Sequence, residues 1–232
     1  MATYVLLPGA GGESSYWQFV TPRLRALGHE VIAPDLPSDD DTAGLREYAD
    51  VVVDAVGDRR GVILVAQSMA GLLVPLLSPR IDIRLVVLVA AMVSAEGELP
   101  GDWWAHTGQE AARRDLDVRE GRDPDAEFDP IVTFLHDVPA DVLAVALDGA
   151  RQQSNTPFEQ TLPMPPWPDV PTRFLLARRD RFFPADFQRR VVRERLGIDP
   201  DEIDGGHLPA LARPAELADR LEQFRETLTE SR

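Results

Sequence analysis

The sequence predicts an α/β fold with a mostly parallel sheet of about six strands flanked by helices. Short apolar runs alternate with helix-like stretches over the first 96 residues, an order typical of parallel strands joined by right-handed crossovers. A polar, proline-punctuated stretch at 97–168 interrupts this alternation, which resumes afterwards. The length of 232 residues suits one α/β core carrying one insertion.

Four strands and three helices are expected before the interruption. A glycine-rich loop at 9–12 follows the first strand, Gly28 marks the end of the first helix, and Pro75 is expected to kink or shorten the third helix. The strands are expected at Tyr4–Leu7, Glu30–Ala33, Val62–Ala66 and Arg84–Ala90, and the helices at Tyr16–Leu27, Leu45–Val56 and Met69–Leu77.

Residues 97–168 are predicted to form an insertion in a core made of residues 1–96 and 169–232. Within the insertion, a regular helix is expected only at Ala140–Ala150. Beyond it we expect strands at Thr172–Ala177 and near Glu202–Ile203, and helices at Ala185–Leu196 and Pro214–Leu228. Parallel sheets bind ligands beyond the carboxyl ends of their strands. Because the insertion leaves from that edge, it is expected to act as a helical lid.

Composition excludes several classes of function. The chain has no cysteine and all 24 basic residues are arginine, which excludes disulfides, thiolate catalysis, cysteine-based zinc sites, lysine Schiff bases and a P-loop lysine. The net charge of −15 disfavours nucleic-acid and anionic-membrane binding. No apolar run is long enough to span a bilayer, and the first residues do not resemble a signal peptide. We therefore expect a cytoplasmic protein, monomeric or homodimeric, whose partner is a small molecule.

Ser68 ends the third predicted strand and precedes a helix, with small residues two positions before it (Ala66) and two after it (Ala70). This arrangement is typical of a nucleophile elbow, a tight strand-to-helix turn that exposes a reactive hydroxyl. The usual residues at the two flanking positions are glycines. The motif alone therefore does not establish a nucleophile, and its surroundings must decide.

A serine nucleophile needs a base that takes its proton. His207 follows the last predicted strand and two glycines, which places it at the same sheet edge as Ser68. His29 is expected at the opposite edge in a structural role, and His106 and His136 lie in the insertion. His207 is therefore the predicted base.

The base also needs an acid that orients it. Asp180 follows the fifth predicted strand and is the preferred candidate, although an aspartate at this position could instead cap the next helix. Asp204, close in sequence to the histidine, and Glu96, after the fourth strand, are the alternatives.

The backbone N–H groups of Ala10 and Met69 are predicted to form an oxyanion hole. Ala10 lies in the glycine-rich loop after the first strand, and Met69 directly follows Ser68. Such a loop could instead bind a phosphate. The dinucleotide pattern Gly-x-Gly-x-x-Gly nevertheless fails, because position 14 is serine.

Five motifs together resemble the α/β-hydrolase superfamily, in which the serine, the acid and the histidine follow in this chain order. The similarity is greatest to small, lid-bearing bacterial hydrolases related to the plant methylesterase and hydroxynitrile lyase group. The two leading antiparallel strands of the superfamily are not expected here. The motifs lie at 6–12, 27–37, 62–71, 179–184 and 206–214.

The resemblance implies a serine hydrolase that uses Ser68, His207 and Asp180 without a metal or cofactor, cleaving a small, mainly apolar ester through an acyl-enzyme. Hydroxynitrile lyase activity is disfavoured because the chain has no lysine, and dehalogenase activity because the nucleophile is not aspartate. A lyase or isomerase that reuses the triad and a non-enzymatic ligand receptor remain alternatives. Six aromatic residues lie in the insertion or near the predicted site, and some of them are expected to line an apolar pocket. They are Tyr16, Trp17, Trp103, Trp104, Trp167 and Phe183.

Overall fold

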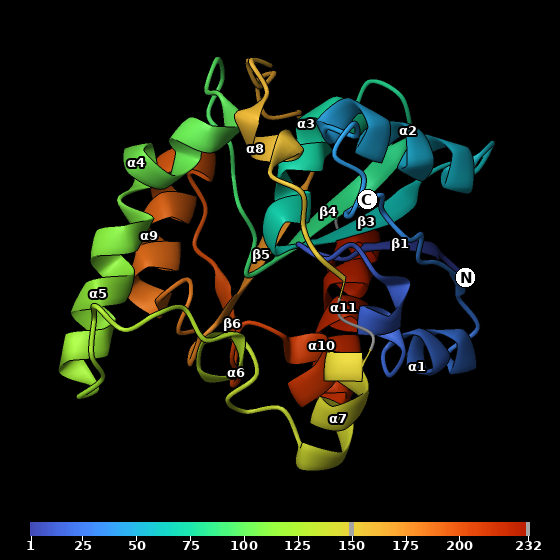
Figure 1. Ribbon diagram of the computed structural model, residues 1–232. Helices are drawn as coiled ribbons and strands as arrows, with labels where there is room; N and C mark the ends of the chain where they lie inside the picture. Colours follow the sequence, from blue (N-terminus) through green and yellow to red (C-terminus); the bar gives the residue numbers. More distant parts are fainter. Residues whose placement is uncertain (149–150, 231–232) are drawn as a thin grey trace.

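The computed structural model describes residues 1–148 and 151–230. Within them, six strands form one parallel sheet in the order β2-β1-β3-β4-β5-β6 (Figure 1). This confirms the predicted fold class. The strands are β1 (Thr3–Leu7), β2 (Glu30–Ile32), β3 (Val62–Gln67), β4 (Ile83–Val89), β5 (Thr172–Ala177) and β6 (Asp201–Ile203).

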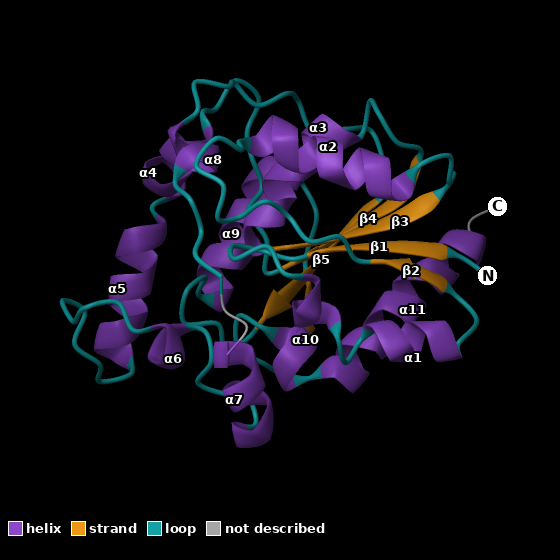
Figure 2. Cartoon of the chain, turned by 45° about the vertical axis from the view of Figure 1, so that its right-hand side comes forward, coloured by secondary structure: helices purple, strands orange, loops and turns teal. Residues whose placement is uncertain are grey.

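Helices cover both faces of the sheet. Figure 2 shows α2 and α3 on one side of the strands and α1 and α11 on the other. Outside the insertion the helices are α1 (Thr21–Ala26), α2 (Leu45–Val56), α3 (Val74–Leu77), α9 (Ala185–Leu196), α10 (Pro209–Ala212) and α11 (Pro214–Glu230), with 3-10 helices η1 (Ser14–Trp17) and η2 (Ser68–Leu73).

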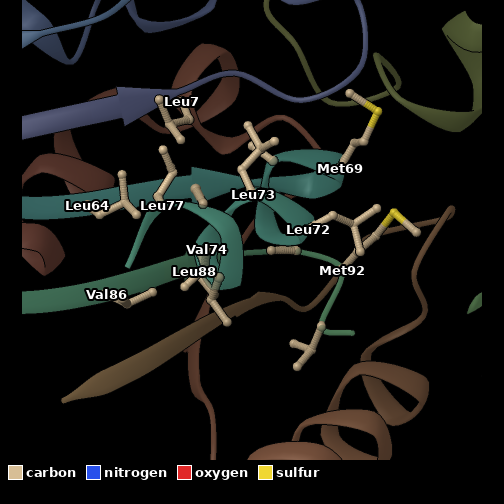
Figure 3. Packing of buried hydrophobic residues seen from close by; sticks show 14 of the residues in the cluster. Leu7, Leu64, Met69, Leu72, Leu73, Val74, Leu77, Val86, Leu88 and Met92 are labelled. Atoms are coloured by element: carbon tan, nitrogen blue, oxygen red, sulfur yellow. The ribbon is translucent and has the colours of Figure 1, made fainter. Parts of the chain in front are cut away.

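The two faces of the sheet carry two separate apolar clusters, because successive side chains of a strand point to opposite faces. In β3, Leu64 belongs to the cluster under α2, α3 and α9, whereas Ile63 and Val65 belong to the cluster under α1 and α11. Figure 3 shows leucines of η2 and α3 packed on side chains of β1, β3 and β4. This packing fixes the carboxyl ends of the strands, where the predicted site residues lie.

Two predicted helices differ from the structure because of prolines. The helix expected at Tyr16–Leu27 is split into η1 and α1, and Pro22 stands in the first turn of α1. Proline has no N–H group and fixes its own φ, so it suits a helix start and disrupts a helix interior. The stretch after Ser68 is the 3-10 helix η2, followed by the single-turn α3 with Pro75 at its start.

The insertion leaves the sheet between β4 and β5, which pair directly with each other. It contains more regular structure than the sequence predicted. Only α7 was expected, and the last two residues of the predicted helix lie outside the described residues. The insertion holds η3 (Pro100–Asp102), α4 (Trp103–Thr107), α5 (Gln109–Arg119), α6 (Pro130–Thr133), α7 (Ala140–Asp148) and α8 (Thr156–Glu159).

Among residues 1–148 and 151–230, no helix combines the length and the apolar character needed to cross a bilayer.

Candidate active site

Ser68 lies at the turn between β3 and η2 with a positive φ of 51°. Non-glycine residues rarely adopt this conformation, which is typical of the strained turn of a nucleophile elbow. Its Oγ lies 3.0 Å from Nε2 of His207. The small residues on either side, Ala66 and Ala70, are both fully buried.

His207 connects Ser68 to Asp180. Its Nδ1 lies 2.7 Å from Oδ2 of Asp180, and both side chains are buried. The other carboxylate oxygen of Asp180 accepts hydrogen bonds of 2.8 Å from the N–H groups of Phe182 and Phe183. Since an ionised carboxylate only accepts, Nδ1 donates the proton and Nε2 presents its lone pair to the serine hydroxyl. The structure thus brings the three predicted residues into one hydrogen-bonded chain.

The alternative acids and the other histidines lie elsewhere. Asp204 is half-exposed and pairs with Arg179, and Glu96 is exposed. His29 bonds Glu222 of α11 and the Ala2 N–H, as expected for a structural residue at the opposite edge. In the insertion, His106 bonds Glu98 and His136 bonds the Arg179 carbonyl.

The loop after β1 packs tightly against the elbow. A Cβ at Gly9 would lie 2.3 Å from Oε1 of Gln67 and 2.8 Å from Cβ of Ser68, so only glycine fits there. Ala10 and Met69, whose N–H groups are the predicted oxyanion donors, both border the cavity that contains Ser68.

This cavity has a volume of about 670 Å³ and contains Ser68 and His207 in its wall. Most of its surface is apolar, with a polar side near the loop after β1. The insertion supplies much of the wall, including Trp104, Phe134, Leu135 and Phe158, while the polar side includes Glu13, Gln18, Arg151 and Gln153. Such a mixture is typical of a small-molecule site.

Two of the six predicted aromatic residues, Tyr16 and Trp104, line the cavity. The other four do not, because they fill the core or the base of the insertion. Trp17 and Phe183 are buried in the two core clusters, Trp103 donates to the Val93 carbonyl, and Trp167 bonds Thr172.

Tyr16, in η1, lines the cavity. The hydroxyl oxygen accepts a hydrogen bond of 3.4 Å from the Ala210 N–H. Burial raises the pKa of this hydroxyl well above its usual range, so Tyr16 stays protonated.

Residues 4–220 match the sequence model of the alpha/beta hydrolase family. The chain belongs to this family. A pyrethroid hydrolase from Sphingobium wenxiniae is 26% identical in an alignment of 251 positions. The alignment covers 98% of this alpha/beta hydrolase and 89% of the relative.

Solved structures of two esterases and a hydrolase share the fold of this alpha/beta hydrolase. Polyneuridine aldehyde esterase superposes with a TM-score of 0.79 at 18% identity, covering 97% of this chain and 99% of the other. A methylesterase from Arabidopsis superposes with a TM-score of 0.76 at 16% identity, covering 98% of this chain and 100% of the other. A pyrethroid hydrolase from Sphingobium faniae superposes with a TM-score of 0.73 at 20% identity, covering 99% of each chain. The predicted resemblance to this group is confirmed.

Sequence reasoning missed residues that shape the site of this alpha/beta hydrolase. Phe182 lines the cavity, although its neighbour Phe183 was the residue named. Phe134 lies against the His207 ring, with the ring centroids 5.1 Å apart. Gln67 donates to the His207 carbonyl at 3.1 Å. Only Gln67 had a usable signal, because it directly precedes Ser68 in the elbow motif.

Proposed function

We propose that this alpha/beta hydrolase is a serine hydrolase that cleaves a small, mainly apolar ester through a covalent acyl-enzyme. The observation that carries the proposal is the hydrogen-bonded chain from Ser68 through His207 to Asp180 at the wall of an apolar cavity. These groups supply a nucleophile, a base and an orienting acid, so the reaction needs no cofactor.

In the proposed acylation step, Ser68 Oγ attacks the ester carbonyl while Nε2 of His207 takes the hydroxyl proton. The Asp180 carboxylate holds the imidazole in the required tautomer and stabilises the imidazolium that forms. The imidazolium then gives its proton to the alkoxide leaving group. An alcohol departs, and the acyl group stays on the serine oxygen.

The backbone N–H groups of Ala10 and Met69 are the proposed donors to the oxyanion of the tetrahedral intermediate. One such donor is worth on the order of 100- to 1,000-fold in rate. The tight contact of Gly9 with Gln67 and Ser68 supports this role, because it fixes the loop close to the elbow. A water molecule, activated by His207, completes the reaction by releasing the acid.

The cavity supports a substrate with an apolar or aromatic body. Trp104, Phe134, Phe158 and Phe182 present rings to the space beside Ser68. Glu13 and Arg151 are charged groups in the cavity wall, and they form an ion pair with each other at 2.9 Å. Their charges therefore neutralise each other. The hydrolase and esterase relatives agree with this reaction class. We further propose that residues 97–168 act as a lid, because they form much of the cavity wall.

The test is covalent labelling together with turnover. The unmodified protein should react with a fluorophosphonate at Ser68 and release p-nitrophenol from short p-nitrophenyl esters with a burst. Ser68→Ala should abolish labelling and lower kcat by at least about 1,000-fold.

Ser78→Ala is the matched control, because Ser78 directly follows α3, away from the cavity, and its hydroxyl donates to the Pro75 carbonyl. It should label and turn over normally. Absence of labelling at Ser68 in the unmodified protein would refute the proposal. Labelling without turnover on a broad ester panel would instead favour a lyase, an isomerase or a ligand receptor.

A further inference from the structure

A short stretch of the insertion, residues 134–137, contacts both loops that carry the acid and the base. His136 Nε2 donates to the Arg179 carbonyl at 3.0 Å, directly before Asp180. Asp137 Oδ2 accepts the Gly206 N–H at 2.8 Å, directly before His207. Phe134 from the same stretch packs its ring against the imidazole.

Asp137 is an unusual residue for a structural contact. Its side chain is only 7% exposed, and its nearest cation, Arg179, is 4.0 Å from Oδ2. Within the described residues, its other oxygen, Oδ1, has no hydrogen-bond partner. A buried carboxylate with half of its bonding capacity unused costs stability. The residue is therefore poorly explained by packing alone.

The backbone before His207 is held by contacts from other segments, among them the Arg179 N–H, which donates to the Gly205 carbonyl at 2.9 Å. Gly205 and Gly206 have no side chains that could hold this loop in place. The Gly206 N–H bonds Asp137 on one side of the histidine, and the His207 carbonyl bonds Gln67 on the other. A Cβ at Gly206 would lie 2.6 Å from Asp137 Oδ1 and 2.8 Å from His136 Nε2, so the loop and the 134–137 stretch are in tight contact.

We propose that Asp137 is a positioning residue for the catalytic base. Its carboxylate, delivered by the insertion, holds the Gly206 peptide so that the His207 ring spans the distance between Ser68 and Asp180. This inference rests on the proposed serine hydrolase function. It also implies that the insertion completes the catalytic machinery as well as enclosing the cavity.

The test compares Asp137→Ala and Asp137→Asn in the full chain with Asp204→Ala as the matched control. Asp204 is a half-exposed carboxylate in the same loop as Gly206, and it pairs with Arg178 and Arg179. For each variant, kcat and KM for p-nitrophenyl butyrate, the rate of fluorophosphonate labelling and the melting temperature are measured.

Asp137→Ala should lower kcat by about 10- to 100-fold, the scale of a small misplacement of a catalytic group. KM should change by less than about twofold, because Asp137 does not line the cavity. Labelling should slow by the same factor as kcat. Asp137→Asn should recover most of the activity, since its amide oxygen still accepts the Gly206 N–H. Asp204→Ala should behave like the unmodified protein.

Unchanged kcat and labelling in a folded Asp137→Ala variant would overturn the inference, and so would a loss confined to KM. Equal losses in the alanine and asparagine variants would also overturn it, because the hydrogen bond would then not be the cause. If the alanine variant does not fold, Asp137→Glu tests the same contact by displacing the carboxylate by one methylene, with the same predicted loss of kcat. Failure of the proposed function looks different: the unmodified protein itself would neither label nor turn over.

Discussion

Gly71 lies in η2, where the turn after Ser68 packs against the segment that follows β4. A Cβ at this position would lie 2.0 Å from the Met92 carbonyl oxygen, which is a backbone atom that cannot swing away. The Met92 N–H in turn donates to the Ser68 carbonyl at 2.9 Å. Gly71 therefore permits the close approach of two segments that hold the elbow.

Gly71→Ala should lower the free energy of unfolding by about 2 kcal/mol or more, because the added methyl group overpacks the contact with Met92. Urea denaturation followed by circular dichroism measures this change. Gly205→Ala is the control, since the nearest atom to its Cβ would be Arg213 Cγ at 3.4 Å. Equal stability of the two variants would contradict the close-packing argument.

At the level of single residues, chain order and position at strand ends were sufficient to select Ser68, Asp180 and His207, and the structure places these three side chains in contact. The sequence did not show which glycines are sterically required. It drew attention to positions 66 and 70, whereas the tight contacts of the elbow occur at Gly9 and Gly71, where an added Cβ would lie 2.3 and 2.0 Å from its nearest neighbour. Such approaches depend on segments distant in the chain, which no local pattern encodes.

A buried ion pair between Glu98 and Arg195 connects the start of the insertion to α9. Both oxygens of Glu98 accept from the Arg195 guanidinium, at 2.6 and 2.8 Å, and the Glu98 side chain is 3% exposed. The Ala95 N–H also donates to this carboxylate. Burial by itself would raise the pKa of Glu98, but the hydrogen bonds, above all those from Arg195, hold it below its usual range.

Glu98→Gln should lower the free energy of unfolding by about 3 kcal/mol near pH 7, because it leaves the Arg195 charge unpaired in a buried site. The folded pKa of Glu98 is depressed, so its contribution is fully present above the unfolded value of 4.5. This contribution is lost as the pH falls through the folded value. The stability difference between the two proteins should therefore narrow at acidic pH.

Chemical denaturation of the unmodified protein and of Glu98→Gln at a series of pH values measures this stability difference. Glu96→Gln is the control, because Glu96 is an exposed carboxylate two residues away. A stability difference that does not depend on pH would contradict the assigned role of the Glu98 charge.

Among the elements, those with strong apolar periodicity were predicted most accurately. The expected bounds of α2, β5 and α9 coincide with the observed ones. The helix α5 was not predicted, because most of its side chains are polar and little apolar periodicity marks it. The stretch 134–137, which contacts the loops that carry Asp180 and His207, has no periodic pattern at all and could only be found in three dimensions.

Over the whole molecule, the net charge of −15 creates a field that opposes anionic ligands. The 24 arginines, including those in ion pairs such as Arg189 with Asp186 and Glu202, are already counted in this net charge. A neutral p-nitrophenyl ester should therefore have a higher kcat/KM than an ester of similar size that carries a carboxylate. The gap should shrink as NaCl rises from about 0.02 to about 0.5 M, since salt screens the field.

Steady-state kinetics across this salt range measures the effect, and the neutral ester serves as the internal control because its kcat/KM should barely respond. A gap that stays constant or widens with salt would contradict long-range repulsion and would indicate discrimination by contacts inside the cavity.

The positive φ of Ser68 has an evolutionary consequence. A residue held in this conformation costs free energy unless it is glycine. A descendant with glycine at position 68 would lose its reactive hydroxyl and relax its backbone in one step, while the cavity around it stayed intact. Selection for stability alone would thus favour glycine at position 68, and the resulting protein could still bind a ligand in its cavity without the serine hydroxyl. Persistence of the serine across related genomes would be a record of continued demand for the reaction itself.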